Sequence, residues 1–224
     1  MNSDQADECK ELCNYDDFMG YALDCSNLKM EDYKEFMPKI FPVVIESKEK
    51  DPFLFYEFVI DRLRELWTAS DTLPFHGPWH HGLIAGIIIA SLRNNGYEFN
   101  DNDVAEALKR GLMIPSGGCG FLGVCGAGIG IGIAFSIIEK ATPLHEKERS
   151  NAMELSSRAI HRIARLGGPR CCTMSTYNTL DFAVRELKAL GYDLPAEKSV
   201  GRCRDPKLND QCHLERCPYY PRKK

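Results

Sequence analysis

The sequence shows almost no alternation of apolar and polar residues, which argues against β-sheet structure. It also lacks a basic surplus. Its 28 lysines and arginines stand against 32 acidic residues, so nucleic acid is not an expected partner. The first twenty residues are acidic and lack the apolar core of a secretory signal. We therefore expect a globular protein in the cytoplasm.

Helical signals are abundant. Asp51 and Pro52 make an N-cap and first turn ahead of apolar residues at helical spacing. A second helix, apolar on every side and therefore central, is predicted from Pro78 to Gly96. Further helices are predicted over residues 101–113, 142–167 and 175–191. The predicted fold is mainly α, with a helical appendage at residues 1–50, a helical core domain at 51–195 and a cysteine-rich tail at 196–224.

Residues 114–138 form an uncharged, glycine-rich run long enough to cross a bilayer. The mean hydropathy of −0.31 and the absence of other long apolar runs argue against a membrane protein. We predict instead one buried helix, whose glycines let neighbouring backbones approach closely. Its first turn, in the sequence PSGGCG, is expected to form part of a pocket.

Two helix starts carry residues suited to chemistry. His80 and His81 fall in the first turn after Pro78, where the helix dipole disfavours a charged imidazole, so they are candidate proton-transfer residues. His76 lies in the preceding turn and is a candidate substrate contact.

The second predicted helix start is the glycine-rich turn. Its N–H groups, at Ser116, Gly117 and Gly118, are candidate ligands for a carboxylate or phosphate. Cys119 at this helix end is a candidate catalytic thiol with a lowered pKa, and Cys125 is a candidate substrate contact on another face. Two such helix starts predict a small anionic substrate.

Ten cysteines in a chain without an export signal point to metal binding, catalysis or thiol redox chemistry. Cys203, Cys212 and Cys217 lie in a tail with few core residues, and one of Cys171 and Cys172 is expected to join them. Four thiolates hold either zinc or a [4Fe–4S] cluster. We favour the cluster because the paired short knuckles typical of zinc are missing. Reduced structural thiols and redox disulfides are the alternatives.

The N-terminal region holds three further cysteines. Cys9 and Cys13 would share a helix face, and Cys25 follows later. We interpret Cys9 and Cys13 as ordinary thiols rather than as ligands.

Several of these motifs together resemble a known group of proteins. HGPWHHG, PSGGCGFLGVCGAGIG, GGPRCCTMST and the closing C-x8-C-x4-C-P resemble an uncharacterised domain family of anaerobic bacteria and methanogenic archaea, some members of which are joined to a methyltransferase domain. The resemblance covers about residues 50–220. It implies oxygen sensitivity and a methyltransferase partner, but no activity. The chain itself has no S-adenosylmethionine-binding glycine motif after a strand.

The late cysteines and the serine-containing glycine loop are also similar to those of iron–sulfur serine dehydratases and cysteine desulfidases. This resemblance implies Cys172, Cys203 and Cys212 as cluster ligands, with an open iron that takes the leaving group. It also implies that residues 116–118 hold a carboxylate while a histidine moves protons. The spacings differ, and Cys217 is an additional thiol.

The sequence thus predicts an oxygen-sensitive iron–sulfur enzyme that acts on a small anionic substrate by elimination or by sulfur removal or transfer. One alternative is a non-enzymatic metal- or sulfur-handling module that partners a methyltransferase. Another is a thiol-redox protein using Cys119, Cys171 and Cys172. A second copy of the chain is a further candidate partner.

Overall fold

The computed structural model describes residues 15–24, 27–196 and 202–222. Within these residues the protein is mainly helical and has no strand, which confirms the predicted fold class. Cys9, Cys13 and Cys25 lie outside the described residues. The helices are α2 (Tyr15–Asp24), α3 (Met30–Phe36), η1 (Met37–Lys39), α4 (Ile40–Glu46), α5 (Pro52–Leu66), α6 (Trp79–Asn94), α7 (Asp101–Leu112), α8 (Gly118–Phe121), α9 (Gly126–Ile138), α10 (Glu146–Leu166), α11 (Cys172–Ala189), η2 (Pro206–Leu208) and η3 (Leu214–Arg216).

The helix starts follow the local signals in the sequence. The Asp51 carboxylate caps α5 by accepting hydrogen bonds from the N–H groups of Phe53 (2.7 Å) and Leu54 (3.3 Å). Helix α6 is buried along nearly its whole length, as expected for a central helix. Helix α10 begins at Glu146, a few residues later than predicted, because residues 142–145 form a turn.

The apolar run at residues 114–138 is not one helix, contrary to the prediction. Helix α8 ends at Phe121, Gly123 adopts a positive φ of 67°, and α9 begins only at Gly126. Across the described residues, every helix is too short or too polar to cross a membrane.

The glycines of α9 do permit close packing, as predicted. A Cβ at Gly130 would lie 2.6 Å from the Cβ of Ile84 on α6. A Cβ at Gly132 would lie 2.5 Å from the carbonyl oxygen of Ala152 on α10. The backbone of α9 therefore fits between these two helices only because both side chains are missing.

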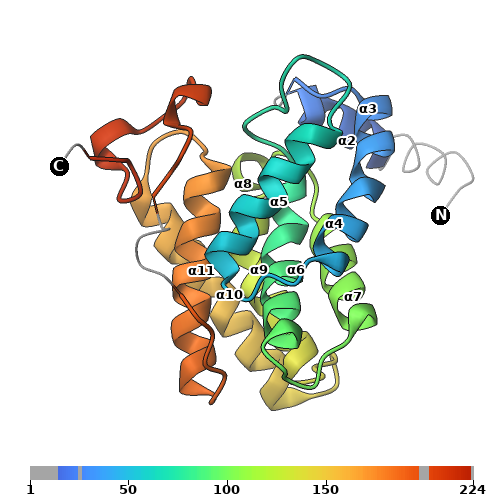
Figure 1. Ribbon diagram of the computed structural model, residues 1–224, viewed down its shortest axis with the longest axis vertical. Helices are drawn as coiled ribbons and strands as arrows, with labels where there is room; N and C mark the ends of the chain where they lie inside the picture. The colour runs from blue at the N-terminus through green and yellow to red at the C-terminus, as the bar shows by residue number, and fades with distance from the viewer. Residues whose placement is uncertain (1–14, 25–26, 197–201, 223–224) are drawn as a thin grey trace, which may run out of the picture.

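Helices α6 and α9 form the centre of the bundle. Helix α9 packs on α6, α7, α10 and α11, while α4 and α5 cover another side of α6 (Figure 1). Ile40 and Val44 of α4 are fully buried in the same core, so this part of the predicted N-terminal appendage packs with the core domain.

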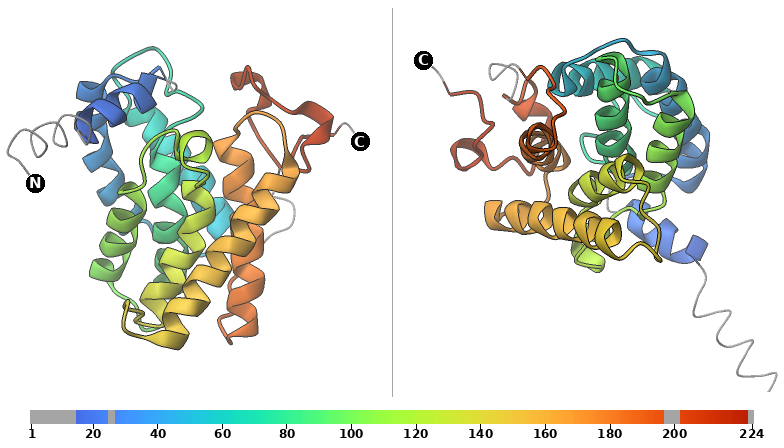
Figure 2. Two further views of the ribbon diagram at one scale, coloured as in Figure 1. Left: turned by 180° about the vertical axis from the view of Figure 1, so that it is seen from behind. Right: turned by 90° about the horizontal axis from the view of Figure 1, so that it is seen from below.

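The tail, residues 202–222, lies beside the upper end of α11, on the side of the bundle away from α3 (Figures 1 and 2). Arg204 pairs with the buried Glu57 and with Asp61 of α5, and Arg64 pairs with Asp205 at 2.8 Å. The N–H of Cys203 donates to the carbonyl oxygen of Tyr219 at 2.7 Å, and this hydrogen bond joins the beginning of the tail to its end. Charge pairs and turns therefore dock this segment onto the bundle.

Candidate functional site

The helix-end cavity, of about 300 Å³, opens where three helices begin. Helix α6 contributes its second and third residues, His80 and His81. Helix α9 contributes its N-cap, Cys125, and helix α11 contributes its N-cap and first residue, Cys171 and Cys172. The positive dipole ends of α6, α9 and α11 therefore meet at one space, which favours a negatively charged ligand.

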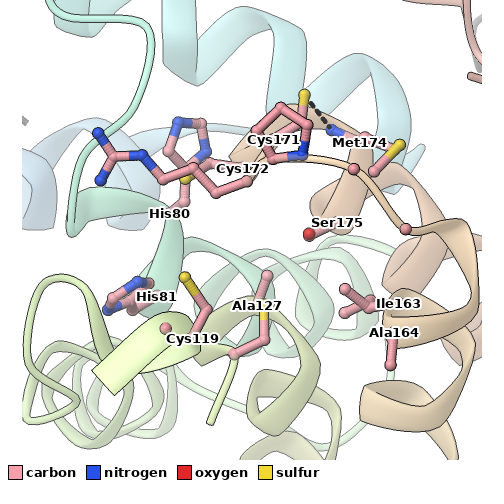
Figure 3. Close-up of a pocket in the computed structure, with 16 residues that line it drawn as sticks. His80, His81, Cys119, Ala127, Ile163, Ala164, Cys171, Cys172, Met174 and Ser175 are labelled. Carbon is pink, nitrogen blue, oxygen red and sulfur yellow. Dashed lines mark hydrogen bonds between the residues drawn. The ribbon is translucent and has the colours of Figure 1, made fainter. Parts of the chain in front are cut away.

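The remaining walls of the helix-end cavity are small, apolar or sulfur-containing. In Figure 3, His81 and Cys119 stand on one side, while Ile163 and Ala164 of α10 stand on the other. Arg170 also lines the cavity and brings a positive charge. No carboxylate side chain is among the described residues that line it, namely His80, His81, Cys119, Gly120, Cys125, Ala127, Ile163, Ala164, Gly167, Gly168, Pro169, Arg170, Cys171, Cys172, Met174 and Ser175.

His81 is held as a neutral imidazole in a defined orientation. Its Nδ1–H donates to the carbonyl oxygen of Ile114 at 3.0 Å, which leaves Nε2 without a proton. Burial lowers the pKa of His81, partly offset by this hydrogen bond. The ring lies directly against Gly126, where a Cβ would come within 2.2 Å of it. His81 therefore offers a free nitrogen lone pair at neutral pH.

His80 is more deeply buried than His81 and is a weaker base. Burial, with smaller contributions from the neighbouring His76 and His81, lowers its pKa to about 3. Its Nδ1 lies 3.4 Å from the Tyr56 hydroxyl, which itself donates to Thr173 at 3.1 Å. A base with so low a pKa accepts protons poorly at neutral pH, so His81 suits proton transfer better than His80.

The tail cavity is smaller, about 10 Å³, and lies between the tail and the start of α11. Four thiols line it: Cys171, Cys203, Cys212 and Cys217. Its other walls are largely aromatic or apolar side chains, with Thr173, Asn209 and His213 as polar exceptions. Cys172 lines the helix-end cavity and is not among the residues lining the tail cavity, whereas Cys171 lines both. Of the adjacent pair, only Cys171 therefore joins the three tail thiols.

All four tail thiols accept backbone hydrogen bonds from residues two or three positions further along the chain. The N–H of Met174 donates to Cys171 at 3.4 Å, and that of Leu214 donates to Cys212 at 3.4 Å. The N–H of Asp205 donates to Cys203 and that of Tyr219 to Cys217. Hydrogen bonds to the sulfurs tune metal–thiolate centres.

The thiols of Cys171, Cys203 and Cys217 nevertheless hold their protons in this state. Burial raises the pKa of Cys171 to about 12 and that of Cys203 to about 11, and the neighbouring thiols add to both increases. Burial also raises the pKa of Cys217. Thiolates would therefore form here only when a metal displaces the protons.

His76 belongs to the surroundings of the tail thiols rather than to the helix-end cavity. Its Nε2 lies 3.0 Å from Oδ1 of Asn209, and the Asn209 side-chain amide donates to Cys171 at 3.7 Å. The N–H of Cys172 donates to Nδ1 of His76 at 3.5 Å. His76, predicted as a substrate contact, thus links the two adjacent cysteines by hydrogen bonds.

The glycine-rich turn is placed differently from the prediction. Ser116 is buried, and Ser116, Gly117 and Gly118 are not among the residues lining the helix-end cavity. The N–H of Gly118 donates to the carbonyl oxygen of Pro115, and only Cys119 and Gly120 of this turn reach the cavity. The N-cap of the long helix is Cys125, not a residue of the turn, because the helix breaks at Gly123.

Four residues were missed from the sequence: Arg170, Met174 and Ser175 in the helix-end cavity, and Asn209 beside Cys171. Arg170 directly precedes the cysteine pair, and Ser175 lies one helical turn after Cys171, so a helix start placed at Cys172 would have indicated both.

Neither cavity is a preformed single-ion site. In the part of the chain that the structure describes, no three His, Cys, Asp or Glu side chains stand close enough to hold one metal ion. Metal binding would require the thiols to turn toward a common point.

Comparison with known proteins places most of the chain in one family. The model of a family described as a family of unknown function (DUF5714) matches residues 40–220. Neither the curated proteins nor the solved structures contain a match to the chain.

Proposed function

The chain belongs to the DUF5714 family of unknown function, and we propose that it is a metalloenzyme acting on a small anionic substrate. In this proposal Cys171, Cys203, Cys212 and Cys217 hold a metal centre in the tail, a [4Fe–4S] cluster or, as the alternative, zinc. The substrate binds in the neighbouring helix-end cavity.

The observation that carries the metal proposal is the gathering of four thiols, each with an N–H donor, around one cavity. These cysteines come from the start of α11 and from three separate turns of the tail. If the cysteines were ordinary reduced thiols without a metal, they would not need to lie around one cavity. A metal would crosslink the tail to α11 and order a segment that contributes little to the apolar core.

The donor set fits either metal chemically, whereas the space fits them unequally. A cavity of about 10 Å³ has space for one ion once the thiols turn toward a common point, whereas a cluster of four irons also requires the tail loops to move outward. Four thiolates would occupy every protein-ligand position of either centre, so neither would act as an open Lewis acid. Zinc would crosslink the tail to α11, and a cluster could also transfer electrons.

The substrate proposal rests on the helix-end cavity. Three helix N-termini and Arg170 provide positive potential, and the cavity volume of about 300 Å³ suits a small molecule. His81 provides a neutral imidazole with a free Nε2, which can accept a proton from the bound molecule. Proton abstraction is a step shared by eliminations and by sulfur removal or transfer, and these remain our proposed reaction classes.

A non-enzymatic module that partners a methyltransferase is the second candidate, because four thiols closed around one centre suit a structural role. The helix-end cavity favours the enzyme, since a purely structural module has no need of it. Both functions require reduced thiols, which suits the cytoplasm.

The test uses protein purified without oxygen and incubated with small hydroxy, amino and thiol acids, while release of ammonia, sulfide or a keto acid is measured. His81→Asn keeps a donor to the Ile114 carbonyl but removes Nε2, and is expected to lower turnover about 100-fold or more. His161→Asn, at an exposed position on α10, is the matched control. Turnover that persists in His81→Asn would contradict this role, and the absence of any turnover would favour the structural module.

A further inference from the structure

The described cysteines gather around two cavities. Cys171, Cys203, Cys212 and Cys217 line the tail cavity, whereas Cys119, Cys125 and Cys172 line only the helix-end cavity, which they share with Cys171, His80 and His81. We propose that Cys119, Cys125 and Cys172 turn toward a common point and bind a second, separate thiophilic metal centre that keeps one coordination position for a ligand in the cavity. This inference deepens the proposed function, because it names the group to which the substrate would bind.

The donors in this cavity are suited to soft metals. Four thiols, those of Cys119, Cys125, Cys171 and Cys172, line it together with the thioether of Met174 and two imidazoles, and no carboxylate is among its described lining residues. Sulfur and imidazole donors select zinc, copper(I) and iron–sulfur clusters over magnesium or calcium, which prefer oxygen. A cavity with four thiols and no carboxylate among its described lining residues is thus poorly matched to an ion that prefers oxygen ligands.

Cys125 is already surrounded by groups that stabilise a thiolate. The N–H groups of Ala127 and Gly128, in the first turn of α9, donate to its sulfur, and so does the Ser175 hydroxyl. Such bonds are stronger to a charged sulfur than to a neutral thiol. A metal ion bound at Cys125 would therefore meet a sulfur that already accepts three hydrogen bonds.

The cavity also has room for an incoming molecule. Its volume of about 300 Å³ is far larger than one ion needs, and it accommodates an inorganic cluster or an ion together with a small anion. Catalytic metal sites commonly use three protein ligands and leave one position open. His81, whose Nε2 carries no proton, lines the same cavity and is a candidate to accept a proton from a metal-bound substrate.

Iron, acid-labile sulfide and zinc are measured per chain in oxygen-free wild type, in Cys119→Ser/Cys125→Ser/Cys172→Ser and in Cys203→Ser/Cys217→Ser. We expect each multiple variant to lose one of two centres and to keep the other. If Cys119→Ser/Cys125→Ser/Cys172→Ser retains the full wild-type metal content, the second centre is refuted. If Cys203→Ser/Cys217→Ser retains the full content and the triple variant does not, the tail proposal fails while the second centre survives.

A second measurement needs no substitution. The Cys119 thiol is exposed in this state, so iodoacetamide should alkylate it rapidly in metal-stripped protein. Ligation should slow its alkylation at least 10-fold in metal-loaded protein, as followed by mass spectrometry of the Cys119 peptide. Equal alkylation rates in the loaded and stripped protein would overturn the proposal even if the triple variant fails to fold.

Discussion

Cys171 borders both cavities, whereas Cys172, its neighbour in the chain, borders the helix-end cavity and not the tail cavity. The separation arises at the start of α11, where Cys171 is the N-cap with extended backbone and Cys172 is the first helical residue. Of these two consecutive thiols, only Cys171 therefore reaches the tail cavity.

The first prediction follows from this separation. Cys171→Ser should remove the metal of the tail, because it deletes one of four thiols. Cys172→Ser, the matched control one residue away, should leave the tail metal in place. Protection of the Cys203 and Cys217 thiols from alkylation reports on the tail alone. Equal protection in both variants would mean that Cys171 is not a ligand.

The second prediction concerns the contact between α6 and α9. Gly130→Ala places a Cβ 2.6 Å from the Cβ of Ile84, and should lower the free energy of unfolding by about 1–3 kcal/mol. Gly20→Ala in α2 meets no atom within 4 Å and should raise it by about 0.5–1 kcal/mol, the helix preference of alanine over glycine. Denaturant unfolding measures both, and a neutral Gly130→Ala would refute the close approach.

The third prediction concerns pH. Burial lowers the pKa of His80 from 6.5 to about 3, so the unfolded chain binds a proton more readily than the folded one. The stability associated with His80 is therefore complete above pH 6.5 and is lost as the pH falls toward 3, by about 2 kcal/mol at pH 5. His80→Asn should remove this part of the pH dependence.

Unfolding measured at pH 7 and pH 5 tests it, with His161→Asn as the exposed control. The test compares the pH dependence of wild type with that of His80→Asn, because Glu57 contributes a pH dependence of opposite sign to both proteins. Burial raises its pKa to about 7, despite the nearby Arg204. Parallel pH profiles for wild type and His80→Asn would show that His80 is not buried as a neutral base.

The fourth prediction concerns docking of the tail. Arg204 contacts Glu57 and makes two hydrogen bonds to Asp61, of 2.8 and 3.0 Å. Because Arg204 is partly exposed, Arg204→Gln should weaken docking by only about 1 kcal/mol and speed proteolysis within the tail about 5-fold. Arg62→Gln removes an exposed pair on the same helix, α5, and should change little. A tail cleaved at the wild-type rate would show that other contacts hold it.

Local signals in the sequence were sufficient to predict the helices. Asp51 with Pro52 and the uniformly apolar segment after Pro78 correctly located α5 and α6, since capping and burial act within a few residues. The break at Gly123 escaped prediction, because a glycine in an apolar run is compatible both with a close helix contact and with a turn.

The candidate site was predictable only in part. The late cysteines and the histidines after Pro78 were recognisable from residue type and spacing, and the lowered pKa of His80 and His81 agrees with the expected neutral imidazoles. Only Cys171 of the adjacent pair reaches the tail cavity, and this difference depends on where the tail docks. That docking is fixed by long-range pairs such as Arg204 with Glu57, which no local pattern reveals.

The central claim is that Cys171, Cys203, Cys212 and Cys217 hold a metal. The most direct test is the content of iron, acid-labile sulfide and zinc per chain in oxygen-free wild type and in Cys203→Ser/Cys217→Ser. We predict that the variant loses about four irons and four sulfides per chain, or one zinc if the tail holds a single ion. Equal metal content in the two proteins would contradict the claim.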